Sequence, residues 1–258
     1  MKRHEDLRGT AGMRRAVSKV RLRVCRNRVA RAAVRTRLPV LQRRDLVRLG
    51  SDYGGWWVPE QAIRGARRAY CAGVGNDVTF DFALIERYDC EVWAFDPTPS
   101  VIDAVARWTT PERWHFEPVG LWDSEGVIRF YAPGLPDHGS LSATNARRTD
   151  DFIEARVEAL AEIMHRLGHD RLDILKMDVE GAEGRVLESM LSSRIRPTVL
   201  CVEFDEPEAP WRTRRRVRSL LAAGYALVMI EHWNYTFLLL DDHSSPRRRD
   251  VNRPATED

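Results

Sequence analysis

Short apolar runs recur along the chain from residue 68 onward. Each is followed by glycine, proline or acidic residues and then by a segment with helical spacing. An apolar run of this length bounded by turn residues predicts a strand that is buried on both faces. We therefore expect strands at Ala69–Gly73, Glu91–Phe95, Trp114–Val119, Leu172–Met177 and Thr198–Phe204.

Helical periodicity fills the intervals between these strands. Asp77 and Ser100 are suited to cap two of the helices. The buried positions of these helices would be Val78, Phe82 and Ile85 in the first, and Val101, Ile102 and Val105 in the second. Two further helices are expected over residues 150–167 and over Ala182–Leu191.

The order of these elements predicts the fold class. Strands that alternate with helices of this length require right-handed crossovers and a mostly parallel sheet, so we expect a doubly wound α/β fold. Val127–Tyr131 alternates like an added strand, and Ala226–Glu231 with Tyr235–Leu240 predicts a C-terminal antiparallel hairpin. Ligands of such sheets bind at the carboxyl ends of the central strands.

Charge divides the chain into a basic arm and an acidic body. Residues 1–48 carry 14 Arg and 2 Lys against 3 acids, whereas the other residues carry 25 bases and 35 acids. We expect a basic, helical arm over residues 1–48 and one domain over residues 49–258. The arm would attract a polyanion such as RNA, anionic lipid headgroups or an acidic protein surface, including the acidic body of this or another subunit.

Cysteine spacing and the lack of long apolar stretches bear on location. Cys25, Cys71, Cys90 and Cys201 form no CxxC pair, which favours a reducing compartment over a disulfide framework or a zinc site. Arginines interrupt every apolar run of the arm, so no signal peptide is expected. No apolar stretch is long enough to span a membrane. We expect a cytoplasmic protein.

The turn Gly73-Val74-Gly75-Asn76-Asp77 is the first candidate binding feature. Its glycines let the backbone turn sharply and approach a ligand. Asp96 ends the next strand, where a carboxylate can accept the hydroxyls of a ribose. The alternatives are a turn without a ligand and an Asp-Pro turn. A dinucleotide fingerprint needs a third glycine at the position of Val78, which disfavours a pyrophosphate ligand.

An acidic cluster is the second candidate feature. A buried strand runs into Asp178, Glu180 and Glu183 around Gly181. Carboxylates grouped at such an edge are costly without a partner, which a sulfonium, a metal ion or a buried arginine would supply. Helix capping by Glu180 and Glu183 is the structural alternative. No spacing among these acids demands a metal.

The run Ile174–Glu183, ILKMDVEGAE, resembles the "LK-D-EG-E" signature of the FkbM family of S-adenosylmethionine-dependent methyltransferases. The similarity extends over roughly residues 51–240 and includes segments 53–59, 73–81, 94–99, 119–126 and 197–203. The basic arm has no counterpart in the family. The resemblance implies a Rossmann-like class I methyltransferase fold, with a mostly parallel seven-stranded sheet and a C-terminal antiparallel hairpin.

The resemblance also implies a cofactor and its site. S-adenosyl-L-methionine would be bound by Cys71, Gly73, Val74, Gly75, Asn76, Asp77, Asp96, Pro97, Gly120, Leu121, Asp178 and Glu180. A hydroxyl is a weak nucleophile until a base takes its proton, and the candidate bases are Asp178, Glu203 and His232. For Glu203 the alternative is pairing with an arginine, and for His232 a structural role in a turn.

These observations predict an O-methyltransferase that acts on a hydroxyl of a sugar, glycolipid or secondary metabolite, and that can form a homo-oligomer. Two other functions stay open. One is an RNA methyltransferase that grips its substrate through the basic arm, although the body has no Asn-Pro-Pro-Tyr-type base-clamping motif. The other is a non-catalytic relative that binds the cofactor without turnover.

Overall fold

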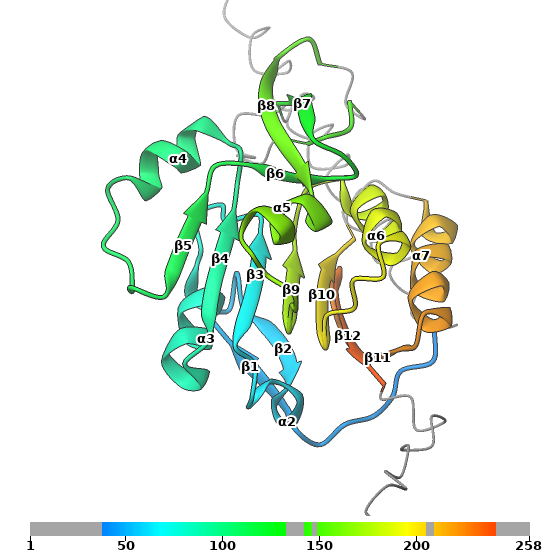
Figure 1. Cartoon of the computed structure of the whole chain (residues 1–258). Coiled ribbons are helices and arrows are strands. Elements are labelled where there is room, and N and C mark those ends of the chain that lie inside the picture. The colour runs from blue at the N-terminus through cyan, green and yellow to red at the C-terminus, as the bar shows by residue number, and fades with distance from the viewer. Residues whose placement is uncertain (1–37, 133–141, 146–148, 205–208, 241–258) are drawn as a thin grey trace, which may run out of the picture.

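The computed structural model describes residues 38–132, 142–145, 149–204 and 209–240 (Figure 1). A seven-stranded sheet lies at its centre. Its strands are β3 (Arg68–Ala72), β4 (Glu91–Phe95), β5 (Trp114–Glu117), β9 (Ile174–Met177), β10 (Val199–Glu203), β11 (Tyr225–Glu231) and β12 (Asn234–Leu239). Their order across the sheet is β11-β12-β10-β9-β3-β4-β5. The strands from β10 to β5 are parallel, and β12 is antiparallel to both of its neighbours.

Both faces of this sheet are buried, as the central strand β3 shows. Ala69 and Cys71 face one apolar core, and Tyr70 and Ala72 face the other. All four side chains are almost fully inaccessible to solvent. A strand covered on both faces needs apolar residues at successive positions. This need explains why the apolar runs of the sequence locate the central strands and the mixed α/β fold.

Helices complete each core. One face carries α2 (Glu60–Ile63), α3 (Thr79–Tyr88) and α4 (Pro99–Val105), whose buried side chains include Ile63, Phe80, Leu84 and Val101. The other carries α5 (Leu160–Arg166), α6 (Glu183–Ser192) and α7 (Pro210–Ala222), which bury Leu160, Ile163, Val186, Met190, Val217 and Leu220. The described helices all fall short of the length and apolar character needed to cross a membrane.

A hairpin that precedes the sheet in the chain packs against the last two strands of the sheet. It consists of β1 (Leu46–Leu49) and β2 (Trp56–Pro59), which pair antiparallel. The Trp57 indole N–H donates to Glu231 at 3.0 Å, and the Thr236 hydroxyl donates to the Trp57 carbonyl at 2.7 Å. The hairpin is thereby fixed to β11 and β12, near the turn that joins them.

The chain upstream of this hairpin also lies on the body. Leu38 and Val40 pack against the core that contains α7, and the Leu41 N–H donates to the Leu227 carbonyl at 2.7 Å. Residues 38–48, which the charge pattern assigns to the basic arm, therefore contact the domain. The helices expected further upstream lie outside the described residues.

A second, three-stranded sheet corrects one sequence prediction. It contains β6 (Gly120–Trp122), β7 (Gly126–Tyr131) and β8 (Phe152–Ala159) in the order β6-β8-β7. The helix predicted over residues 150–167 is wrong in its first half, because β8 pairs antiparallel with β7 along its length. The apolar residues at the end of the range fit a helix, but pairing with a distant strand determines the conformation before Leu160.

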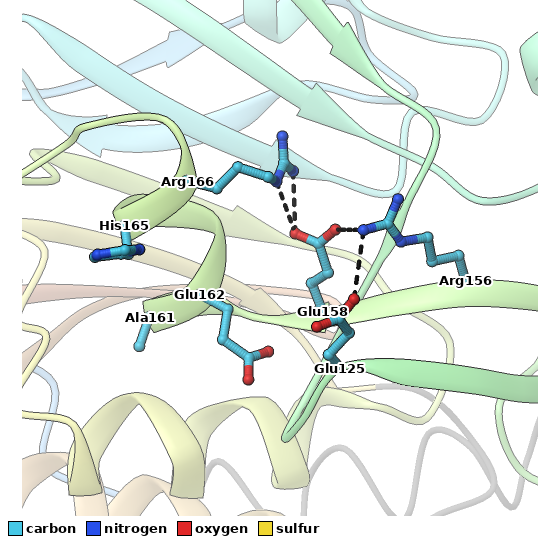
Figure 2. A pocket seen from close by; sticks show the side chains of 7 residues that line it. All are labelled: Glu125, Arg156, Glu158, Ala161, Glu162, His165 and Arg166. Atoms are coloured by element: carbon cyan, nitrogen blue, oxygen red, sulfur yellow. Dashed lines mark hydrogen bonds and ion pairs between the residues drawn. The ribbon is translucent and has the colours of Figure 1, made fainter.

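The junction between β8 and α5 is held by ion pairs, which Figure 2 shows around an open pocket. Glu158 is 4% exposed and accepts from Arg156 at 2.8 Å and from Arg166 at 3.0 Å. Arg166 also reaches Glu117 at the end of β5, at 3.0 Å. These contacts tie the smaller sheet to the edge of the larger one.

The predicted buried face of one helix and the predicted cap of another also need correction. The predicted buried face of the first helix, Val78, Phe82 and Ile85, is only partly buried. The side chains that α3 buries are Phe80, Asp81 and Leu84, because the helix begins at Thr79 and turns this face to the sheet. Helix α4 begins at Pro99 with Thr98 as its N-cap residue, so Ser100 lies inside the first turn and does not cap the helix.

Candidate functional site

A cavity of about 640 Å³ opens at the carboxyl edge of the central strands. The turns after β3, β4 and β9 form its floor, and the ends of β10 and of the β11–β12 hairpin form one side. It is lined by every predicted site residue except Cys71, namely Gly73, Val74, Gly75, Asn76, Asp77, Asp96, Pro97, Gly120, Leu121, Asp178, Glu180, Glu203 and His232. Residues 73 and 232, far apart in the chain, thus border one space.

Cys71 is the exception because it faces the opposite core. Its side chain is 2% exposed and packs towards α3, where it hydrogen bonds with Asp81. Burial raises the pKa of the Cys71 thiol well above its usual range. The cysteine therefore cannot contact a ligand in the cavity, and the next residue, Ala72, lines the cavity instead.

The glycine turn lets β3 and β9 approach closely. Gly73 has φ +82°, and a Cβ added there would lie 1.9 Å from the Asp178 carbonyl oxygen. Gly75 has φ +53°, with no atom within 4 Å of an added Cβ. Both positions favour glycine through their left-handed backbone, but only Gly73 is also enclosed by backbone. The turn after β3 is thus built directly against the turn after β9.

Asp96 fastens the glycine turn to the end of β4. One carboxylate oxygen accepts from the Val74 N–H at 3.0 Å and from the Gly75 N–H at 3.2 Å. The other accepts from the Thr98 N–H at 2.9 Å. An ionised carboxylate offers about four acceptor positions, so three of these are used and one is left for a ligand. The residue predicted to hold a ribose therefore also shapes the turn.

Lys176 is a cavity residue that the sequence analysis missed. It is 7% exposed, donates to the Gly73 carbonyl at 2.7 Å, and lies 4.0 Å from the Asp178 carboxylate. Burial opposes its charge, but the neighbouring carboxylates, Asp178 and Asp81 first, outweigh burial and raise the pKa of Lys176. A single lysine inside an apolar strand is the signal that would have identified it. Its charge compensates the acidic residues beside it.

Glu203, at the end of β10, lies in an environment that favours its protonated form. Burial, together with the adjacent charge of Asp178 and a hydrogen bond with it, raises the pKa of Glu203 well above its usual range. The negative charge of Glu180 acts in the same direction. The Glu203 carboxyl group is therefore a weaker acid than an exposed glutamate.

Two residues with unusual backbone conformations border the acidic side of the cavity. Glu180 has φ +48° and His232 has φ +55°, in the turns after β9 and β11. Non-glycine residues in this region of φ cost free energy and cluster at functional sites. Asn234 lines the cavity beside His232. His232 is thus brought to the site, as predicted from its place past a strand end.

Asp77 connects the cavity to the turn between β1 and β2. Its carboxylate accepts from the Ser51 hydroxyl and, at 2.9 Å, from the Thr79 N–H. Burial acts to raise the pKa of Asp77, but these hydrogen bonds outweigh it and lower the pKa. A Cβ on Gly54 would lie 2.7 Å from the Asp77 side chain. Asp77 therefore stabilises the turn between β1 and β2, in which Tyr53 and Gly54 line the cavity.

The charge of the cavity favours particular ligands. The acids Asp77, Asp96, Asp178 and Glu180 line it, against the single buried Lys176. Such a surface suits a cation or a group rich in hydroxyl and amino donors, and it disfavours phosphates. Among the described residues, no three His, Cys, Asp or Glu side chains are arranged to hold a metal ion.

Comparison with known proteins gives a match across this region. A family model described as the Methyltransferase FkbM domain matches residues 61–235. The chain is 27% identical over 124 residues to "Probable methyltransferase-like protein 24" of Homo sapiens, and 26% identical over 125 residues to the protein of that name from Rattus norvegicus. Each alignment covers 48% of this chain but only 28% of the relative. No solved structure matches the chain.

Proposed function

Because this chain belongs to the FkbM methyltransferase domain family, we propose that it is a Rossmann-like, class I S-adenosyl-L-methionine-dependent O-methyltransferase. Its acceptor would be a hydroxyl of a sugar, glycolipid or secondary metabolite. The observation that carries the proposal is the meeting of Gly75, Asp96 and Asp178 around one cavity, from three different strand ends. In an open α/β sheet this edge is where ligands bind.

Residues of the cavity suit the ribose, the sulfonium and the amino group of the cofactor. The glycine turn gives close access to backbone, and the remaining acceptor position of Asp96 suits a ribose hydroxyl. The carboxylates of Asp178 and Glu180 suit the positive charges of the sulfonium and the amino group. When bound, the cofactor supplies an electrophilic methyl group on sulfur.

Asp178 is the best-placed general base. In the proposed transfer, the acceptor oxygen would gain the methyl group, and the sulfur of the cofactor would keep the electron pair of the bond that breaks. The proton of the acceptor hydroxyl must move to a basic group. We assign this role to Asp178, which lines the cavity and lies 4.0 Å from the Lys176 ammonium group, with His232 as the other candidate among the lining residues. Holding the two reactants in line can supply on the order of 7–11 kcal/mol of the barrier reduction.

Calorimetric titration with S-adenosylhomocysteine tests the cofactor site. The wild-type chain should bind this product with an affinity in the micromolar range. Asp96→Ala removes the ribose acceptor and the anchor of the glycine turn, so it should abolish binding. Asp103→Ala, on the exposed side of α4, is the matched control and should leave the affinity unchanged. Absence of heat with the wild-type chain would reject the proposed cofactor.

Methyl transfer needs a separate measurement. The chain is incubated with S-adenosylmethionine carrying an isotopic label in the methyl group, together with sugars, glycolipids and RNA in parallel. Label in a sugar or glycolipid, lost in Asp178→Asn, supports the proposal. Label in RNA alone would favour the RNA methyltransferase, and cofactor binding without transfer to any acceptor would favour the non-catalytic relative.

A further inference from the structure

Helix α7 presents a strip of positive charge that has no role in the cavity. Its sequence, PWRTRRRVRSLLA, contains five arginines and no acid. Thr213, Val217 and Leu220 face the core. The opposite face exposes Trp211, Arg212, Arg215 and Arg218. We call these four residues the α7 strip.

The arginines of the α7 strip differ from other exposed arginines in their partners. Arg129 and Arg185 each form an ion pair with an acid, at 3.1 and 2.8 Å. Within the described part of the chain, Arg212, Arg215 and Arg218 form no ion pair with a carboxylate. Among the described residues no carboxylate balances their charge, which favours a negatively charged partner.

Apolar side chains lie at both ends of the α7 strip. Trp211, at the start of the helix, is 59% exposed, and the Arg212 guanidinium lies 5.3 Å from the centre of its ring. At the other end, Leu240 is 50% exposed and donates its N–H to the carbonyl of Gly224, just after the helix. Leu41, 44% exposed, hydrogen bonds nearby to β11. Arginines flanked by an exposed tryptophan and leucines are typical of surfaces that lie at a lipid–water interface.

The basic N-terminal sequence joins the domain at the same side. Residues 1–37 contain 11 Arg and 2 Lys against 2 acids. They precede Leu38, which packs against the core that contains Val217 and Leu220 of α7. In Figure 1 the first described segment, in blue, begins close to the lower end of α7. The described chain therefore begins on the face that carries α7.

We propose that this face docks on a membrane surface rich in anionic lipids through the α7 strip. The outward face of a helix packed on a sheet is convex, so it can lie against a plane of headgroups. A single nucleic-acid strand is more often followed by a groove lined with aromatic side chains. The strip begins at the edge of the sheet where the cavity opens, since α7 follows β10 and Glu203.

Vesicle co-sedimentation of the full chain tests the proposal. Two kinds of vesicle are compared. One contains phosphatidylcholine with about a third phosphatidylserine, an anionic surface that attracts basic segments, and the other contains phosphatidylcholine alone. The wild-type chain should sediment with the anionic vesicles only, and added salt should release it. Each arginine near such a surface contributes about a fivefold factor, so the triple variant R212Q/R215Q/R218Q should partition on the order of 100-fold less.

A matched variant controls for net charge. Arg64, Arg67 and Arg107 are exposed and lie outside both α7 and the basic arm. R64Q/R67Q/R107Q removes the same charge elsewhere and should reduce binding far less. Equal loss in the two triple variants, undiminished binding of the α7 variant, or binding to RNA but not to anionic vesicles would overturn the proposal. None of these outcomes depends on whether the cavity binds S-adenosylmethionine.

Discussion

The two glycines of the turn after β3 provide a matched test of how the site is built. Both have positive φ, so replacement by alanine costs each a similar backbone strain, about 1–2 kcal/mol. Their surroundings differ. An added Cβ at Gly75 meets nothing within 4 Å, whereas at Gly73 it meets the Asp178 carbonyl oxygen at 1.9 Å. The difference between the two variants therefore isolates the contact between the turns after β3 and β9.

The magnitude follows from which atoms must move. The obstacle at Gly73 is backbone, and β3 and β9 are paired up to Ala72 and Met177, so relief requires the strand ends to separate. Overpacking of this kind costs about 1–3 kcal/mol beyond the strain. Parting the ends would also weaken the 2.7 Å bond from Lys176 to Gly73. We expect Gly75→Ala to lose about 1 kcal/mol of unfolding free energy and Gly73→Ala about 3 kcal/mol or more.

Urea unfolding followed by far-ultraviolet circular dichroism measures both variants. The prediction is a clear separation of their midpoints, with Gly75→Ala close to wild type. Equal destabilisation by the two substitutions would refute the reasoning, because it would mean that the close approach of Gly73 to Asp178 does not constrain the native state.

Three further predictions concern neighbouring contacts. Glu203→Gln keeps a neutral side chain. Because the pKa of Glu203 is raised, its contribution to wild-type stability is greatest below its ordinary pKa of 4.5 and falls as pH rises, so the variant should lose less stability over this range. Parallel pH profiles of the two proteins would contradict the assignment. Glu158→Gln should lower the unfolding free energy by about 1–3 kcal/mol, because two arginines lose a buried partner. The control Glu154→Gln, whose pair with Arg129 is half exposed, should lower it by about 0.5 kcal/mol, and equal losses would reject the reasoning. Asp77→Asn should speed amide hydrogen exchange at residues 51–54 by about tenfold, which corresponds to the loss of one charged hydrogen bond. Exchange no faster than in the control Asp103→Asn would show that Asp77 does not stabilise the turn.

The sequence predicted the parts of the fold that burial alone determines. Strands β3, β4, β9 and β10 are covered on both faces, so their apolar runs are continuous and easily located. Their carboxyl ends meet at one edge in any parallel sheet, which is why Asp96 and Asp178 could be assigned to one site. The helix over residues 150–167 failed because the apolar residues from Leu160 onward extend a helical period backwards into β8. The strand there depends on pairing with β7, which the local sequence does not encode.

Side-chain roles within the site were harder to predict. Lys176 was missed because its partner, the Gly73 carbonyl, lies 103 residues away in the sequence. Cys71 was assigned to the cavity from its place in the motif, but strand alternation turns it to the other face. The double role of Asp96 depends on two N–H groups of a neighbouring turn and on distances that no sequence pattern specifies.

A crystal structure of the chain with S-adenosylhomocysteine would test the central claim most directly. The account predicts the ribose at Asp96, the backbone of Gly73 to Gly75 against the ligand, and the sulfur on the side of the cavity that contains Asp178 and Glu203. A ligand bound elsewhere on the surface, or one in this cavity with its sulfur turned away from both carboxyl groups, would contradict it.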